Sequence, residues 1–268
     1  MSALTRARQS LAVVALALAV AASIPQASAG PREIEKQEFC ANKAGLYFTD
    51  FSIEACSFLI LSHNKTPKDL AIVFSHRCKE YLKEKKFDRA LQDCDEAIWL
   101  DSNLLAAYQI RGLVYEQASQ HRHAVTDFAQ VIAQQPSSAS AWEGLCRNEL
   151  ALGHIRLAIS ACSESLRLRP DDATTLVTRG RAYLMSGVLG EAIADFDAAL
   201  RANPAFATAL YGRGVARLNR HDHKKGEADI AAATLIQGDI AKQFADHQRI
   251  KPSDDVMTST RPGIDKTN

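Results

Sequence analysis

The sequence carries almost no net charge, and this limits the partners it can have. Its 32 basic and 31 acidic residues leave a formal charge of +1 over 268 residues. Strong attraction to nucleic acid or to an anionic membrane needs a large excess of basic residues. The composition therefore gives no reason to expect either partner.

Long apolar runs are also scarce, with one exception near the start. An apolar run over residues 11–24 follows Arg6 and Arg8 and ends before Ala27-Ser28-Ala29. A basic start, a short apolar segment and small residues at a cleavage site are typical of a secretory signal peptide, whereas a membrane-spanning helix needs about 20 apolar residues. We expect residues 1–29 to be a cleaved signal, with an uncleaved anchor as the alternative. The remainder is expected to be periplasmic or secreted, without stable membrane insertion.

The sequence lacks the patterns of common catalytic and cofactor sites. It has no phosphate-binding loop, no nucleophile elbow, no HExxH and no C-x-x-C pair, so the corresponding chemistries are not indicated. Two His-x-His tripeptides, 121–123 and 221–223, would need a third ligand nearby to hold a metal. We interpret them as exposed turns, and we expect no catalytic residue, no metal and no cofactor.

Cysteines are few, and their spacing is unusual. The six cysteines form three pairs whose members are sixteen residues apart: Cys40 and Cys56, Cys78 and Cys94, and Cys146 and Cys162. Metal and redox motifs have much closer spacings. An even number of cysteines in an exported chain makes disulfides possible.

What the sequence does contain is a repeat of thirty-four residues. Gly112, Gly180 and Gly214 are separated by 68 and 34 residues. In each unit, apolar residues recur three, four and seven apart, which is the helical period, on both sides of a short polar turn. We therefore expect each unit to be an antiparallel pair of helices. The register gives five units, 71–104, 105–138, 139–172, 173–206 and 207–240.

These units resemble the tetratricopeptide repeat (TPR) family, whose repeat has the same length and the same kinds of residue at these offsets. The last unit departs from the pattern, with Arg217 for the usual tyrosine and Gly238 for the proline. The resemblance implies an all-α, right-handed α-solenoid of helical hairpins, the TPR superhelix. The unit that matches best carries Leu176, Gly180, Tyr183, Ala192, Phe196, Ala199 and Pro204.

In such hairpins the spacing of sixteen has a geometric meaning. With residues numbered from 1 to 34 in each unit, the last two cysteine pairs occupy repeat positions 8 and 24, and their midpoints Lys86 and His154 lie in the expected turns. We expect all three pairs to be disulfides within one hairpin, with buried free thiols as the alternative. Cys40 and Cys56 then define a cryptic first unit, 33–66, inside an N-terminal segment 30–70. A cysteine-bearing segment of this kind before the repeats resembles exported TPR proteins of alphaproteobacteria.

A second set of residues has the same spacing. Arginine at position 7 and aspartate at position 23 occur together in four units, and both are replaced in the fifth, by Leu145 and Ala161. We expect partly exposed ion pairs across the hairpin, each contributing under about 1 kcal/mol. The pairs are Arg77/Asp93, Arg111/Asp127, Arg179/Asp195 and Arg213/Asp229.

By analogy with TPR domains, positions 5 and 9 face a concave groove. The expected groove residues are Ser75, Lys79, Gln109, Leu113, Glu143, Arg147, Val177, Arg181, Tyr211 and Val215. This mixture favours an extended peptide or a partner helix with acidic and apolar side chains, although these faces could also simply be solvated. Residues 241–250 are expected to form a capping helix, with Ile240 and Phe244 inward, and 251–268 a disordered tail.

The sequence thus predicts an exported scaffold that binds a protein or peptide and has no catalytic activity. The alternatives are a self-associating structural protein and a redox or metal-dependent accessory protein using cysteine or histidine chemistry.

Overall fold

The computed structural model describes residues 31–42, 45–62 and 65–246, and these ranges contain helices and turns but no strand. The expected signal peptide and the expected disordered tail lie outside the described residues. The all-α fold class is confirmed. The helices are α2 Pro31–Ala41, α3 Thr49–Leu61, α4 Pro67–Lys83, α5 Phe87–Leu100, α6 Leu105–Gln117, α7 His121–Gln134, α8 Ala139–Ala151, α9 Ile155–Leu168, α10 Ala173–Met185, α11 Leu189–Ala202, α12 Ala207–Asn219, α13 His223–Ile236 and α14 Ile240–Asp246.

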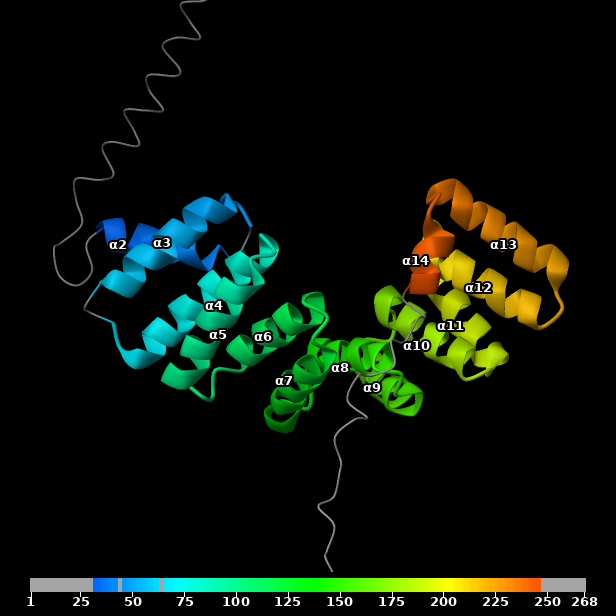
Figure 1. Ribbon diagram of the computed structural model, residues 1–268, viewed down its shortest axis with the longest axis horizontal. Coiled ribbons are helices and arrows are strands. Elements are labelled where there is room, and N and C mark those ends of the chain that lie inside the picture. The colour runs from blue at the N-terminus through cyan, green and yellow to red at the C-terminus, as the bar shows by residue number, and fades with distance from the viewer. Residues whose placement is uncertain (1–30, 43–44, 63–64, 247–268) are drawn as a thin grey trace, which may run out of the picture.

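Consecutive helices pack as hairpins, α2 with α3, α4 with α5 and so on to α12 with α13. The first helices of successive hairpins also contact one another, whereas the second helices do not, within the part of the chain that the structure describes. The array therefore curves, with its first helices on the inner side and its second helices on the outer side (Figure 1). This arrangement is an α-solenoid, in which each hairpin packs against its neighbours.

The turn inside each hairpin from α4 to α13 has the same backbone conformation. The residue at repeat position 15 has a φ of 57° to 79°, in the left-handed region. A left-handed residue after the last helical turn is a common helix ending, and glycine adopts it without a steric penalty. The residues are Lys85, Ser119, Gly153, Gly187 and His221.

Helix α4 begins four residues before the expected start of its unit at Ala71. The Thr66 hydroxyl accepts a hydrogen bond from the Asp69 backbone N–H, and the Asp69 carboxylate accepts one from the Thr66 N–H. Such a capping box stabilises a helix start, and Pro67 suits the first helical position. Residues 67–70, which precede the expected start of the unit, are therefore helical.

Large aromatic residues fill the space between successive hairpins. Phe128 is fully buried and packs against Gly112 in its own hairpin and Gly144 in the next one. A Cβ atom at Gly144 would lie 2.5 Å from the Phe128 ring. Phe196 is held in the same way by Gly180 and Gly212. Each phenylalanine at position 24 thus depends on one glycine on either side.

Candidate functional site

The inner side of the array is formed by one face of each first helix. On α4 this face carries Ile72, which is 43% exposed, and Lys79, which is also exposed. These two residues are seven apart, and residues at this spacing share a helix face. Ser75 lies 2% exposed in the core and donates a hydrogen bond to the carbonyl of Ile72. The first hairpin with a full repeat thus offers a cation next to an apolar side chain.

The middle of the inner side is a network of charged side chains that joins α6 to α8. Arg147 donates hydrogen bonds to both carboxylate oxygens of Glu116, at 2.8 and 3.1 Å, and one to Glu143 at 2.6 Å. Glu143 also accepts a hydrogen bond from Arg169 at 2.8 Å. Burial lowers the pKa of Arg147, but the hydrogen bond and charge of Glu116 and the charge of Glu143 outweigh it and raise that pKa above its ordinary value. Arg147 is therefore a neutralised cation.

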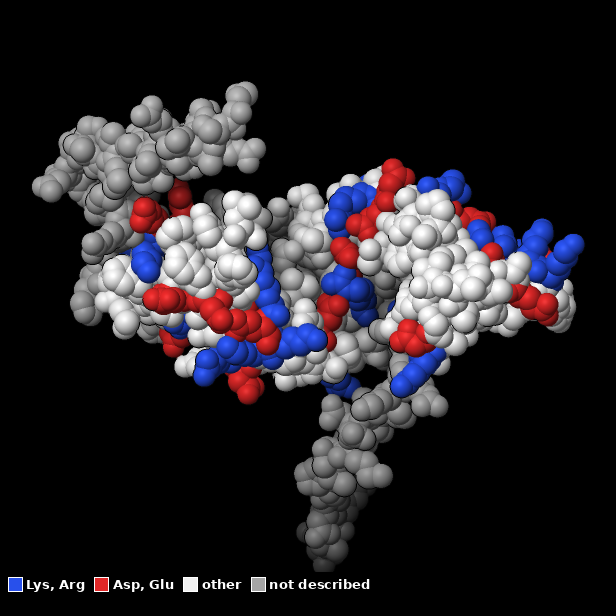
Figure 2. Space-filling model, turned by 90° about the horizontal axis from the view of Figure 1, so that it is seen from above, with Lys and Arg blue, Asp and Glu red and all other residues white. Residues whose placement is uncertain are grey.

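The network continues beneath the surface. Asn148 is buried and donates a hydrogen bond to Glu116 at 2.9 Å, while its side-chain oxygen lies 2.8 Å from the Nδ1 atom of His121. Gln109 donates a hydrogen bond to the Ser140 hydroxyl at 2.7 Å, which links the same two helices nearer their starts. These bonds hold the inner side chains of neighbouring hairpins in fixed positions. Figure 2 shows the molecule from above relative to Figure 1, with basic and acidic side chains side by side on this face.

The C-terminal end of the inner side is covered by α14. Phe244 is 3% exposed, its ring centroid is 5.1 Å from that of Tyr211, and the Arg181 guanidinium lies 5.7 Å from it. Val177 is buried in the same core cluster, and Val215 is partly buried against it. Burial lowers the pKa of Arg181 below its ordinary value. The structure thus brings these four expected groove residues together around a segment of the same chain.

The remaining expected groove residue, Leu113, lies on α6. It is partly buried against the core clusters of its own and the preceding hairpin. Of the ten residues, Lys79, Gln109, Leu113, Glu143 and Arg147 therefore line the part of the inner surface that no other helix of the described ranges covers.

The arginines at position 7 make more contacts than their spacing indicated. Each donates two hydrogen bonds of 2.6–2.9 Å to the aspartate at position 23 of its hairpin. The aspartate side chains are only 3–9% exposed and the arginines 17–22%, so the pairs are more buried than expected. The hydrogen bonds and charges of Asp127 and Asp95 outweigh burial and raise the pKa of Arg111 above its ordinary value.

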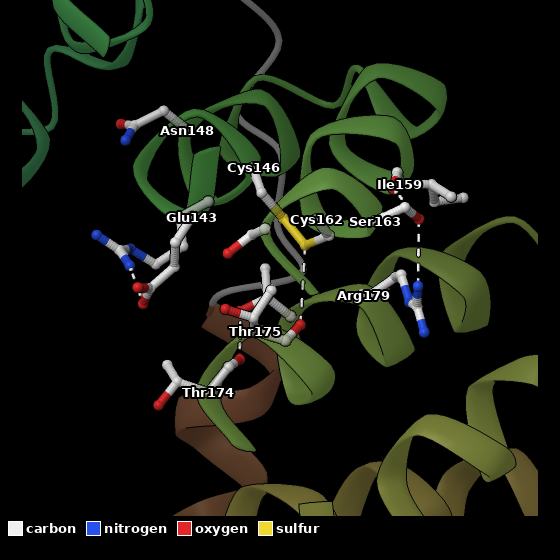
Figure 3. The surroundings of a disulfide bond; sticks show 12 residues. Glu143, Cys146, Asn148, Ile159, Cys162, Ser163, Thr174, Thr175 and Arg179 are labelled. Carbon is white, nitrogen blue, oxygen red and sulfur yellow. Dashed lines mark hydrogen bonds and ion pairs between the residues drawn. A yellow bond between two sulfur atoms is a disulfide. The ribbon is translucent and has the colours of Figure 1, made fainter. Parts of the chain in front are cut away.

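Each of these arginines also reaches the preceding hairpin, which the sequence reasoning missed. Its third hydrogen bond goes to position 25 of that hairpin, as from Arg179 to Ser163 at 3.2 Å (Figure 3). At the one junction without the arginine, position 25 holds Ala129. Position 25 of the preceding unit thus changes together with positions 7 and 23, and this joint change can be read from the sequence. The acceptors are Ser57, Asp95, Ser163 and Asp197.

The six cysteines form three disulfides in the structure, each between the two helices of one hairpin. Their Cα atoms lie 4.7 Å apart in Cys40–Cys56, 5.6 Å in Cys78–Cys94 and 5.1 Å in Cys146–Cys162. All six sulfur-bearing side chains are buried. Figure 3 shows the third disulfide beside the start of α10. Disulfides persist in oxidising compartments, and these three indicate such an environment.

The histidines of the two His-x-His tripeptides make other contacts. His123 packs against Tyr115, and His221 and His223 lie with ring centroids 6.3 Å apart. Within the described ranges, no group of three His, Cys, Asp or Glu side chains could hold a metal ion. In the same ranges, no helix has the length and apolar character needed to cross a bilayer.

Comparison with known sequences identifies the same repeats. The sequence profile described as tetratricopeptide repeat matches residues 111–173, 145–199 and 177–241. Human tetratricopeptide repeat protein 33 is 31% identical over 86 residues, which are 32% of this chain and 33% of that protein. The match thus spans about a third of the human protein's length.

Solved structures share the fold. YrrB, described as a TPR protein with an unusual peptide-binding site, superposes with a TM-score of 0.59 and 23% identity, over 72% of this chain and 99% of its own. A tetratricopeptide repeat protein from Parabacteroides merdae gives a TM-score of 0.64 and 14% identity, over 82% and 90%. At these identities the likeness concerns the fold alone. Together with the profile matches and the hairpin geometry, it shows that the chain belongs to the tetratricopeptide repeat family.

Proposed function

We propose that this chain is an exported scaffold that binds an extended peptide or a partner helix along the inner faces of α4, α6 and α8. Proteins of this family typically serve as interaction scaffolds, and a known relative in fold, YrrB, is described as having a peptide-binding site. The observation that carries the proposal is the inner surface of these three helices, which no other described helix covers, in contrast to the inner surface that α14 covers.

The side chains on this surface favour a ligand that is both acidic and apolar. Lys79 is exposed beside Ile72, whereas Arg147 is already paired with Glu116 and Glu143. Lys79 is therefore the cation that a ligand carboxylate would meet, with Ile72 and Leu113 as the apolar contacts. Because Gln109 and Arg147 are held by neighbouring helices, the receptor would lose little conformational entropy when the ligand binds.

Site-specific photocrosslinking tests this surface. A photoreactive amino acid in place of Gln109 should capture a partner from the exported fraction, whereas one in place of Gln92, exposed on α5, should not. Lys79→Glu should abolish the capture at 109, and Lys224→Glu, a matched reversal of an exposed lysine on α13, should leave it unchanged. Equal capture at 92 and 109, or capture at 109 that survives Lys79→Glu, would refute the proposed surface.

Export rests on the amino-terminal sequence and on the disulfides, and it has its own test. Mass spectrometry of the protein isolated from its source should find Gly30 as the first residue and no free thiol. A chain that retains residues 1–29, or one with reduced cysteines, would contradict export as a cleaved and oxidised protein.

A further inference from the structure

Helix α3 exposes large apolar side chains next to its buried face. Ser52, Ala55, Cys56 and Leu59 form the buried face. Phe51 is 40%, Phe58 49% and Leu61 75% exposed, and Phe48 just before the helix is 88% exposed. A cluster of large exposed apolar residues marks an interaction surface, so this part of α3 calls for a partner. We call Phe48, Phe51, Phe58 and Leu61 the α3 stripe.

In the neighbouring hairpin, two of the three corresponding residues are charged. Phe51, Phe58 and Leu61 occupy repeat positions 19, 26 and 29, which lie on the outer side of the second helix. In α5 the corresponding residues are Arg89, Glu96 and Trp99. The α3 stripe is therefore not simply the open end of the array, because this outer side is left to solvent in α5. Among the other large exposed apolar residues, Trp99 and Leu157 stand singly on α5 and α9, and Leu235 and Ile236 are consecutive at the end of α13.

The stripe is symmetric along the chain. Phe51 and Phe58 are equally far from the midpoint between Glu54 and Ala55, and so are Phe48 and Leu61. If a second α3 lies antiparallel against the first, Phe51 of each copy therefore faces Phe58 of the other copy. The same operation brings Phe48 opposite Leu61. A two-fold interface requires such a self-complementary patch.

Charge complements this arrangement. Glu54 is exposed between the aromatic residues, and the Lys36 ammonium lies 5.8 Å from the Phe51 ring centroid and 5.5 Å from that of Phe58. Lys36 is therefore near the midpoint of the stripe, where Glu54 of a second copy would arrive. Two such Lys–Glu pairs would offset the repulsion between the two Glu54 carboxylates. The Phe39 ring, 4.8 Å from that of Phe51, supports the surface from below.

We propose that two copies of this chain associate through the α3 stripe, antiparallel and about a two-fold axis near Glu54. The proposal is independent of the peptide-binding surface, which lies on the opposite side of the hairpins. The first hairpin would then join two arrays and leave both inner surfaces open.

Light scattering and sedimentation over a concentration series test the proposal on the exported chain. The wild type should form a dimer, and Phe58→Ser should raise the dissociation constant at least tenfold. Trp99→Ser is the matched control, because it removes an exposed apolar side chain from the same side of α5, and it should not change the dissociation constant. Circular dichroism establishes that each variant remains helical.

A charge exchange tests the register. Glu54→Lys and Lys36→Glu should each weaken the dimer, and the double variant should restore it, since the pairs re-form with their signs reversed. A wild type that is monomeric at every concentration would overturn the proposal. Binding of such a monomer to zwitterionic lipid vesicles would not rescue it, because the stripe would then be a membrane-binding surface. A dimer that withstands Phe58→Ser, or a double variant as weak as the single ones, would overturn it too.

Discussion

A single arginine at repeat position 7 ties three helices together. Arg111 binds Asp127 in its own hairpin and Asp95 in the preceding one. Where Leu145 takes this position, Ala161 and Ala129 replace both acceptors. The three positions change together because a buried carboxylate left without its arginine is costly, whereas an apolar set of matching size is tolerated.

The chain's own apolar set supplies a test of this coupling. Arg111→Leu should lower the free energy of unfolding by about 3 kcal/mol, because Asp127 remains buried without a partner. The double variant Arg111→Leu with Asp127→Ala copies two of the three natural positions and should recover most of the loss, because the remaining acceptor, Asp95, is 57% exposed. Urea unfolding followed by circular dichroism measures both, and a double variant as unstable as the single one would contradict the coupling.

The single variant should also respond to pH. Burial raises the pKa of the Asp127 carboxyl above its ordinary value even beside Arg111. A carboxyl whose pKa is higher in the folded than in the unfolded protein lowers the free energy of unfolding once it ionises. This destabilisation is absent below the unfolded-state pKa and grows as pH rises from that value through the folded-state pKa. Arg111→Leu raises the folded pKa further. The loss of unfolding free energy in Arg111→Leu relative to the wild type should therefore shrink on acidification from neutral pH. A loss that grows on acidification would contradict the prediction.

Glycine positions provide a steric test at the same scale. Gly144→Ala should destabilise the protein by about 2 kcal/mol, since the new Cβ atom meets the fully buried Phe128 ring. Gly190→Ala is the matched control, because Gly190 lies in α11 with nothing within 4 Å of the added atom. It should leave stability unchanged or raise it by up to about 1 kcal/mol. Comparable destabilisation by the two substitutions would show that the glycine–phenylalanine packing is unimportant.

At the scale of one hairpin, a disulfide and a buried phenylalanine are alternative ways to close the same space. Position 24 holds Phe128 and Phe196 in two hairpins and Cys94 and Cys162 in two others. After each phenylalanine, position 6 of the next hairpin is glycine, and after these cysteines it is Ile110 or Thr178. The smaller disulfide therefore leaves room for a larger side chain from the neighbouring hairpin.

Removing one disulfide should weaken its hairpin first. Cys78→Ala with Cys94→Ala should lower the free energy of unfolding by about 3 kcal/mol, because the unfolded chain regains the freedom of a loop closed over sixteen residues. Hydrogen exchange should show earlier opening in α4 and α5 than in α10 and α11. Reductant should shift the wild type in the same direction, and unchanged exchange in α4 and α5 would argue against this role.

Helix α14 closes the other end of the array, in the place of a further first helix. Phe244→Ala should destabilise the protein by about 3 kcal/mol, because the ring is buried against Tyr211 and Arg181. Lys242→Ala, an exposed change on the same helix, should have little effect. Amide exchange should increase in α12 for the first variant only. If both variants exchange like the wild type, α14 does not stabilise its neighbour.

For the whole molecule, stability depends on how strongly each hairpin is coupled to the next. The junction between α7 and α8 lacks the arginine at position 7, and the inner network of Arg147, Asn148 and Glu116 joins α6 to α8 instead. Besides the packing of Phe128 against Gly144 in the core, the two halves of the array are therefore held together on the same side that we propose binds the partner.

Breaking this network should uncouple the halves. Arg147→Met should separate the unfolding of residues 67–134 from that of residues 139–246, because Glu116 loses two of its hydrogen bonds at the junction. Arg167→Met, which changes an exposed arginine on α9, should leave one shared transition. Hydrogen exchange across a urea series resolves the two segments, and coincident transitions in the Arg147 variant would contradict the prediction.

From the sequence alone we could derive the helical hairpins, their thirty-four-residue register and the fact that residues sixteen apart meet across a hairpin, because these depend only on helical period and turn position. The pairing of Arg111 with Asp127 follows from that arithmetic. What it could not show is which residues meet between hairpins. The repeat positions of Asp95 and Gly144 could be assigned from the sequence, but their contacts depend on how adjacent hairpins pack.

Which inner residues are available to a partner depends on how the hairpins and α14 pack together. Arg147 is neutralised by Glu116 from the preceding hairpin, Val177 is buried, and Arg181 lies against Phe244 from beyond the last repeat. The curvature of the array brings these side chains together across distances that periodicity does not encode. The physical reason is that helices are local in sequence, whereas the exposure of a side chain depends on every neighbour that packs against it.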